Sequence, residues 1–143
     1  MPIKIIDYNS TEYKQVIELR YMLLRQPLGL TFNQEDLDKE KDDIHIAAYE
    51  EDELLGCCFL SKVNVDTVKL RQMAVKGNLQ GKGIGRQMMQ FAENIARDYG
   101  NKCITMHARK DAVGFYEKLG YTANGAEFIE VQLPHYEMSK PLL

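Results

Sequence analysis

The stretch LQGKGIGRQMM, residues 79–89, combines three closely spaced glycines with two cationic side chains. It follows an apolar segment, VKLRQMAV (68–75), and leads into residues with helical spacing of apolar side chains. The first turn of a helix has backbone N–H groups without partners, and the helix dipole favours anions there. Glycine lets the backbone approach a phosphate closely. The stretch therefore predicts a phosphate-binding turn, with charge added by Lys82 and Arg86; a plain flexible turn is the alternative.

Two common phosphate-binding motifs are absent from this stretch. No Lys-Ser or Lys-Thr follows the glycines, which excludes a Walker loop, and Gly85 comes one residue too early for a dinucleotide fingerprint. The next apolar segment, KCITMHA (102–108), has no acidic residue that could bind a ribose. The pattern therefore disfavours a kinase, a GTPase or a dehydrogenase.

Composition and charge narrow the class of protein further. The 143 residues suit one domain, 1–143, and the net charge of −3 is unusual for a nucleic-acid binder. No apolar run has the length of a membrane span, and no signal peptide begins the chain, so we expect a cytoplasmic protein without a membrane partner. The three cysteines lack CxxC spacing, and Cys57 and Cys58 would point to opposite faces of a strand, so we expect buried, reduced thiols.

The elements that must position this loop alternate between strands and helices. We expect strands at 3–6, 45–49, 54–63, 68–75, 102–108 and around 135–140, and helices after Ser10, over 84–99 and over 112–120. The polar turn between 45–49 and 54–63 predicts a hairpin, and the acidic stretch 33–43 predicts a solvated short helix or loop. In the helix over 84–99, the face of Ile84, Met88, Ala92, Ile95, Ala96 and Tyr99 is apolar, and Gly100 is placed to cap it. The class is mixed α/β.

Several segments together resemble one family. QGKGIG (80–85) resembles the Q/R-x-x-G-x-G/A pyrophosphate loop of the GNAT superfamily, the GCN5-related N-acetyltransferases. The matching segments, in family order, are LRQMAV (70–75), the helix at 85–100, HARKDAVGFYEKLGYTANG (107–125) and EFIEVQLPHYEMSK (127–140). The last is similar to the ending of the bacterial ElaA-like subgroup, with Gln132-Leu133 in place of the usual Gly-Ile. The resemblance covers 68–143 in the expected order and spacing.

The resemblance implies a GNAT fold: a mixed, mostly antiparallel sheet with splayed central strands, flanked by helices. Acetyl-CoA would lie as co-substrate between 70–75 and 102–108, and its acetyl group would move to a primary amine by direct attack through a tetrahedral intermediate. The implied cofactor contacts are Met73, Ala74, Val75, Gln80, Gly81, Lys82, Gly83, Ile84, Gly85, Arg86, Arg109 and Phe115. The acceptor would be a small-molecule or peptide amine. A homodimer is an open alternative, and no residue pattern indicates a metal.

Tyr116 is the candidate acid for the leaving thiolate. In the family, the tyrosine of this FY pair often has its hydroxyl near the CoA sulfur. Helical spacing places Phe115 on a core face with Ala112 and Leu119, and Tyr116 lies about 100° away, so it points elsewhere. The alternative role for Tyr116 is half-buried packing.

The base is left open between two histidines, each with a structural role as its alternative. His107 ends the strand before Arg109, and His135 matches the subgroup's PH pair; an unperturbed histidine titrates in the range a base needs. Other side chains near the proposed cleft also receive assignments. Glu127 and Glu130 line the substrate mouth or belong to the solvated surface, and one of Arg71 and Gln72 faces the cleft. Arg109 contacts cofactor phosphates or a substrate carboxylate, and His45 packs or makes a capping bond.

Two other classes of function stay in view. The chain could be a non-catalytic acyl-CoA-binding module, whereas an RNA-binding or structural domain fits an acidic chain poorly. Because every phosphate-binding feature follows residue 68, we expect residues 10–43 to form part of the acceptor wall. The acidic stretch within it would suit a cationic acceptor or simply a solvated surface.

Overall fold

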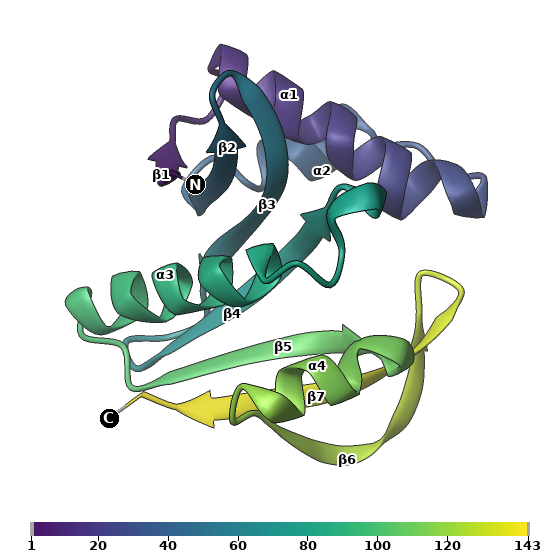
Figure 1. Ribbon diagram of the computed structural model, residues 1–143. Coiled ribbons are helices and arrows are strands. Elements are labelled where there is room, and N and C mark those ends of the chain that lie inside the picture. The colour runs from purple at the N-terminus through teal and green to yellow at the C-terminus, as the bar shows by residue number, and fades with distance from the viewer. Residues whose placement is uncertain (1, 143) are drawn as a thin grey trace.

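The computed structural model describes residues 2–142 and contains one seven-stranded sheet with the order β1-β2-β3-β4-β5-β7-β6 (Figure 1). The strands are β1 (Ile3–Ile6), β2 (Ile44–Glu50), β3 (Glu53–Lys62), β4 (Thr67–Val75), β5 (Cys103–Arg109), β6 (Thr122–Glu130) and β7 (Leu133–Pro141). All neighbouring pairs are antiparallel except β4 and β5, which are parallel. The expected mixed, mostly antiparallel fold class is confirmed.

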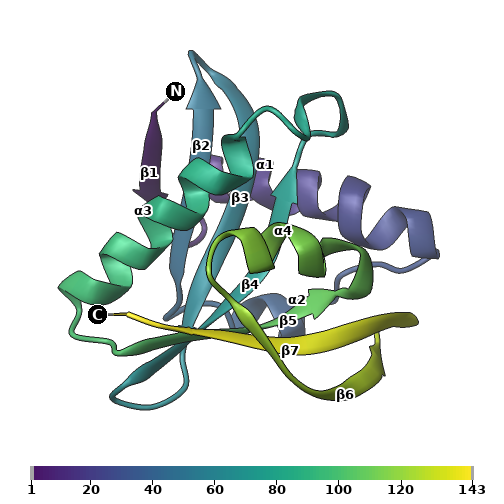
Figure 2. The ribbon, with the colours of Figure 1, turned by 60° about the horizontal axis from the view of Figure 1, so that its bottom comes forward.

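Helices cover both faces of the sheet. They are α1 (Thr11–Arg20), α2 (Gln34–Asp38), α3 (Ile84–Asp98) and α4 (Val113–Lys118), with a π-helical turn η1 (Tyr21–Arg25) and 3-10 turns η2 (Gln26–Leu28), η3 (Gly77–Leu79) and η4 (Lys110–Ala112). Figure 2 shows α3 and α4 on one face of the sheet and α1 on the other. As the sequence predicted, the Ser10 side chain caps α1 by accepting a hydrogen bond from the Tyr13 amide at 3.1 Å.

Each face of the sheet has its own apolar core. Under α3 and α4, Met89, Ala92 and Ala96 pack against strand residues such as Ile104 and Met138, all of them fully buried. Under α1, the core contains Tyr13, Val16 and Leu19 with Ala47 and Ala74 of the strands. Cys57 lies in this second core and Cys58 in the first, which confirms that the adjacent thiols point to opposite faces. Burial raises the pKa of both thiols, which keeps them protonated.

The predicted apolar face of α3 is wrong at its last member. Ile84, Met88, Ala92 and Ala96 are buried, whereas Tyr99 is 64% exposed. Tyr99 is the C-cap residue after Asp98, the last residue of the helix; its amide still donates to the Ile95 carbonyl at 3.1 Å, but its side chain is not covered by the core at this end. Gly100 follows at φ 80°, the left-handed conformation that a helix C-terminus favours.

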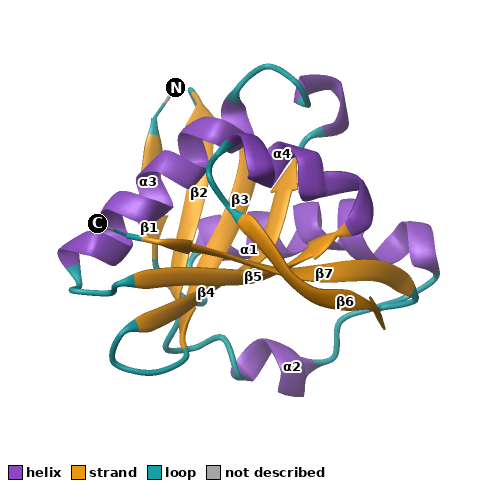
Figure 3. Cartoon of the chain, turned by 90° about the horizontal axis from the view of Figure 1, so that it is seen from below, coloured by secondary structure: helices purple, strands orange, loops and turns teal. Residues whose placement is uncertain are grey.

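The strand β6 was not predicted, and it pairs with β7 in a twisted hairpin (Figure 3). The turn between them uses Val131 and Gln132, both at positive φ, 48° and 67°. Such turns usually contain glycine or asparagine, so their sequence signal is missing here. Near the other end, the pairing register shifts between Asn124 and Phe128, which interrupts the alternation that would have identified a strand.

Candidate functional site

The two central parallel strands separate along their length. The pairing of β4 with β5 runs from Thr67↔Cys103 to Leu70↔Met106 and then stops, although β4 continues to Val75 and β5 to Arg109. Beyond this point, a cleft of about 980 Å³ is lined by both strands, η1, α4 and the glycine loop. The expected splay of the central strands is confirmed.

A β-bulge in β4 accompanies the splay. Cys57 pairs with Ala74 and Phe59 with Arg71, so two residues of β4 oppose one residue of β3, and Gln72 has a φ of 55°. A bulge bends its strand and interrupts the two-residue alternation of side chains. Arg71 and Gln72 both line the cleft, so the prediction that only one of them could face it is wrong.

The glycine loop closes one end of the cleft. Gly81 and Gly83 have φ values of 84° and 85°, and Gly83 is the N-cap of α3, where no side chain makes a capping hydrogen bond. The first amides of α3 therefore remain for a ligand. Gly85 has a different reason to be glycine, because a β-carbon there would lie 3.2 Å from the Cζ atom of Phe115. This bare, cationic turn has the properties of a phosphate cradle.

The loop side chains divide into those that face the cleft and those that do not. Gln80 and Arg86 line it, and Gln80 Nε2 also donates to the Val75 carbonyl at 3.1 Å, which holds the loop against the end of β4. Lys82 is exposed outside the lining, and the Ile84 side chain is buried in the core, so Ile84 offers a ligand only its backbone. The other predicted cofactor contacts that line the cleft are Met73, Ala74, Val75, Gly81, Gly83, Gly85, Arg109 and Phe115.

Tyr116 lies at the inner wall of the cleft. It is 6% exposed, its ring packs against Phe115 and Tyr121 at centroid distances of 5.0 and 5.9 Å, and within residues 2–142 its hydroxyl has no hydrogen-bond partner. Burial, with a smaller contribution from Cys58, raises the pKa of Tyr116 well above its usual value. The phenol is therefore protonated at neutral pH and is free to donate to a ligand.

The sequence assigned the two aromatic residues of α4 to the wrong faces. Phe115, expected in the core, is 39% exposed and lies over Gly85, whereas Tyr116 is the buried member. Helical spacing identifies which residues share a face, but it does not decide which of two apolar faces turns inward. The packing of Tyr116 against Tyr121 decides it here.

On the opposite side of the cleft, Glu130 joins the two candidate bases. Its Oε1 atom is 2.9 Å from His107 Nδ1, and its Oε2 atom is 3.8 Å from His135 Nε2. His135 Nδ1 is 2.8 Å from the Leu133 carbonyl, which only accepts, so this nitrogen carries a proton. His135 is 5% exposed and engaged by the backbone, which favours a structural role for it over that of a base.

The tautomer of His107 follows from the same reasoning. Nδ1 also lies 3.3 Å from Lys69 Nζ, but it cannot accept from Lys69 while it donates to Glu130. The shorter contact to a carboxylate is the stronger one, so we assign the proton to Nδ1. Nε2 of His107 then keeps its lone pair and is the atom that can accept a proton.

The charge state of Glu130 fits this arrangement. Partial burial alone would raise its pKa, but the hydrogen bond from His107, the positive charge of the two histidines when they are protonated at acidic pH, and the charge of Lys69 outweigh burial and lower the pKa. Glu130 is therefore ionised at neutral pH. The sequence placed Glu130 near the substrate mouth without linking it to His107, because the link depends on the unpredicted strand β6.

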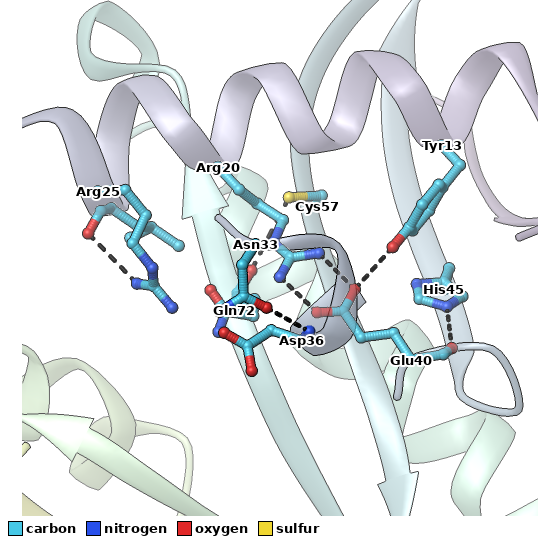
Figure 4. A network of polar contacts seen from close by, with 10 residues as sticks. Tyr13, Arg20, Arg25, Asn33, Asp36, Glu40, His45, Cys57 and Gln72 are labelled. Carbon is cyan, nitrogen blue, oxygen red and sulfur yellow. Dashed lines mark hydrogen bonds and ion pairs between the residues drawn. The ribbon is translucent and has the colours of Figure 1, made fainter. Parts of the chain in front are cut away.

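A buried ion pair fixes the helical wall of the cleft (Figure 4). Arg20, 1% exposed, donates from both terminal nitrogens to the Glu40 carboxylate at 2.7 Å, and Tyr13 donates its hydroxyl to the same carboxylate at 2.9 Å. The sequence predicted that the acidic stretch 33–43 is solvated. Glu40 is buried, so this prediction is wrong at Glu40. His45 Nε2 contacts the Glu40 carbonyl at 2.8 Å, the kind of structural bond predicted for His45.

The Arg20–Glu40 ion pair holds the start of η1, because η1 directly follows Arg20. Leu23, Leu24 and Arg25 of η1 line the cleft, so part of 10–43 contributes to its wall; that this part contacts the acceptor stays a prediction. No sequence signal indicated Arg25, because its placement depends on a π-helical turn.

Residues 2–142 also answer two further questions, on metal-binding groups and on membrane-spanning helices. No group of three or more histidine, cysteine, aspartate or glutamate side chains is arranged there to hold a metal ion. None of the helices in this range is long and apolar enough to cross a membrane.

Comparisons with known proteins agree with this geometry. A family model described as "Acetyltransferase (GNAT) domain" matches residues 30–142. The Bacillus subtilis protein YyaT is 30% identical over 98 residues, which are 68% of this chain and 66% of that protein, so the match spans just under two thirds of the relative's length. Among solved structures, Escherichia coli ElaA superposes with a TM-score of 0.81 at 20% identity, covering 98% of this chain and 99% of ElaA. An aminoglycoside 6'-N-acetyltransferase complexed with coenzyme A superposes with a TM-score of 0.80 at 19% identity, covering 100% of this chain and 98% of that protein.

Proposed function

The chain belongs to the acetyltransferase (GNAT) domain family, and from this premise we propose that it is an N-acetyltransferase that moves an acetyl group from acetyl-CoA to a primary amine. One observation carries the proposal. A single cleft connects a glycine turn suited to phosphate, a buried protonated phenol at Tyr116, and a histidine with a free lone pair at His107. We further propose that residues 1–143 act as one domain, since all strands belong to one sheet.

The residues present suit acetyl-CoA. The uncapped N-terminus of α3 and the positive-φ glycines make room for a pyrophosphate beside free amides, and Arg86 adds charge. Between this turn and Tyr116, the edge of β4 from Met73 to Val75 faces the cleft and supports the position expected for the pantetheine arm. The carbonyl of Val75 is already bound by Gln80, so its role there is to hold the loop. Bound acetyl-CoA would supply the acetyl group as a thioester.

Two side chains of the protein would transfer the two protons of the reaction, one from the amine and one to the sulfur. An amine attacks a carbonyl only in its neutral form, and His107 Nε2, with Nδ1 held by Glu130, would accept the proton that the amine loses. When the carbon–sulfur bond breaks, the Tyr116 hydroxyl would protonate the departing sulfur. A phenol with a raised pKa is a weak acid, but a thiolate is a stable leaving group with a pKa near 8.5, so modest assistance is sufficient.

The proposal is tested by incubating the protein with acetyl-CoA and a panel of primary amines. The readout is the N-acetylated amine, identified by mass spectrometry, because Cys103 is partly exposed and would disturb a thiol reagent. Calorimetry with CoA runs in parallel. Product formed with at least one amine supports the transferase. Tight CoA binding with no product from any amine would instead identify a non-catalytic acyl-CoA-binding module.

A further inference from the structure

The cleft carries the opposite charge balance from the chain as a whole. The chain has a net charge of −3, yet five cationic side chains line the cleft against two carboxylates. The cations are Arg25, Lys69, Arg71, Arg86 and Arg109, and the carboxylates are Asp111 and Glu130. Such a concentration of one sign in a cleft attracts a ligand of the other sign.

The five cations form no close ion pair with the described part of the chain. Among residues 2–142, no carboxylate oxygen lies within 4.0 Å of their charged nitrogens, although seven lysine or arginine ion pairs of that length occur outside the cleft. Glu130, which could have served them, is engaged by His107 at 2.9 Å. Keeping unpaired like charges together opposes folding, so a ligand that neutralises them would gain binding energy.

Arg86 belongs to the phosphate turn, whereas three other arginines surround the open part of the cleft. Arg71 precedes the bulge of β4, Arg109 ends β5, and Arg25 projects from η1. Within residues 2–142, the Arg25 guanidinium contacts neutral groups: it donates to the Leu24 carbonyl at 3.4 Å and lies 5.0 Å from the centre of the Phe32 ring. Burial and then the charges of Arg20 and Arg109 lower the pKa of Arg25, and Arg25 and Arg109 both line the cleft.

We propose that the acceptor is an amine that also carries a carboxylate, and that Arg25, Arg71 and Arg109 bind this carboxylate while the amine faces His107. The inference rests on the proposed function and specifies its acceptor. Guanidinium groups match the planar geometry of a carboxylate and bind it through paired hydrogen bonds. Polyamines, in contrast, would meet unpaired positive charge, so the cationic acceptor considered from the acidic stretch is disfavoured.

Matched acceptors test the proposal directly. Suitable pairs are γ-aminobutyrate and its amide, β-alanine and its amide, and glycylglycine and its amide, with spermidine as the polycation. Rates are compared at equal concentrations of neutral amine, since the amide changes the amine pKa. We expect kcat/KM for the carboxylate members to exceed that for the amides by about 10- to 100-fold, the range for a hydrogen bond to a charged group. The difference should lie mainly in KM.

Single-charge variants then locate the effect. Arg25→Gln and Arg71→Gln should each raise the KM for the carboxylate acceptor by about tenfold, whereas the KM for the matching amide acceptor should not rise. The matched control is Lys62→Gln, which removes a cation from an exposed strand end outside the cleft lining. The control should keep the wild-type preference.

The outcomes separate this inference from the proposed function. Turnover with a carboxylate preference that Arg71→Gln removes supports both. Equal turnover of the two members of each pair overturns the acceptor assignment and keeps the transferase. If no amine is acetylated, calorimetry on the CoA-bound protein decides: tighter binding of the carboxylate members retains the assignment and refutes the transferase, and equal binding refutes both.

Discussion

Glu130 Oε1 lies 2.9 Å from His107 Nδ1, which joins the end of β6 to the end of β5, the two strands that flank β7 in the sheet. The contact fixes the proton of His107 on Nδ1 and leaves Nε2 as the basic atom. It also gives the cleft an ionised carboxylate whose pKa is lowered chiefly by His107, against the opposing effect of partial burial.

Stability should depend on pH through Glu130. A carboxyl group whose pKa is lower in the folded state contributes stability above its unfolded pKa, and that contribution is lost as the pH falls through the folded pKa. Glu130→Gln should therefore lower the melting temperature at pH 7, and the gap to the wild type should close as the pH falls below the ordinary pKa of a glutamate. Paired thermal melts across this range measure it. A gap that stays constant with pH would show that Glu130 acts through packing alone.

Tyr116→Phe should reduce turnover by about 10²-fold, equivalent to about 2.7 kcal/mol of barrier, with CoA affinity nearly unchanged. The substitution removes only the hydroxyl, which makes no protein hydrogen bond within residues 2–142, so the fold should be little affected. Single-turnover rates at several pH values with a confirmed acceptor are the measurement.

The matched control is Tyr121→Phe. The Tyr121 hydroxyl donates to Glu93 Oε2 at 3.0 Å in the buried core and does not line the cleft. Its loss should cost about 1–3 kcal/mol of stability and leave turnover intact. If Tyr116→Phe turns over at the wild-type rate, the sulfur receives its proton from another source and the acid role is wrong.

Gly83→Asp should abolish the stabilisation that CoA confers. Ligand at about 100 times its dissociation constant adds about 2.7 kcal/mol to the free energy of unfolding. A side chain at φ 85° strains the turn, and a carboxylate there would repel the phosphates. Thermal shift with and without CoA is the measurement, and Gly77→Asp, outside the cleft lining and without a positive φ, is the control. A full shift in folded Gly83→Asp protein would remove the turn from the cofactor site.

Arg20→Met should destabilise the protein by about 3–5 kcal/mol, because it leaves the Glu40 carboxylate buried without its partner. Chemical denaturation measures this loss. Asp36→Asn is the control: it breaks an exposed pair with Lys39 at 4.0 Å and should change stability by less than about 0.5 kcal/mol. We also expect Asp36→Asn to leave the CoA dissociation constant unchanged, since Asp36 does not line the cleft. Similar losses in both variants would mean that the Arg20 pair contributes no more than a surface contact.

Local patterns in the sequence were sufficient to predict the glycine turn and most elements. The glycines, the helix that follows them, the N-cap at Ser10 and the strands β1 to β5 all depend on neighbouring residues, so their positions could be predicted. The order of these segments also indicated the family, and with it the splayed strands and the cofactor cleft.

The tertiary structure decided the features that depend on residues far apart in the chain. Gln72 adopts a positive φ because β4 bulges against β3, Tyr116 is buried because Tyr121 packs against it, and Glu130 reaches His107 because β6 returns beside β7. None of these features has a local sequence signal: a glutamine does not indicate a bulge, and periodicity does not determine which face of a helix turns toward the core. Burial and charge pairing are properties of the packed chain, and for that reason the cationic character of the cleft emerged only once the strands and η1 were brought together.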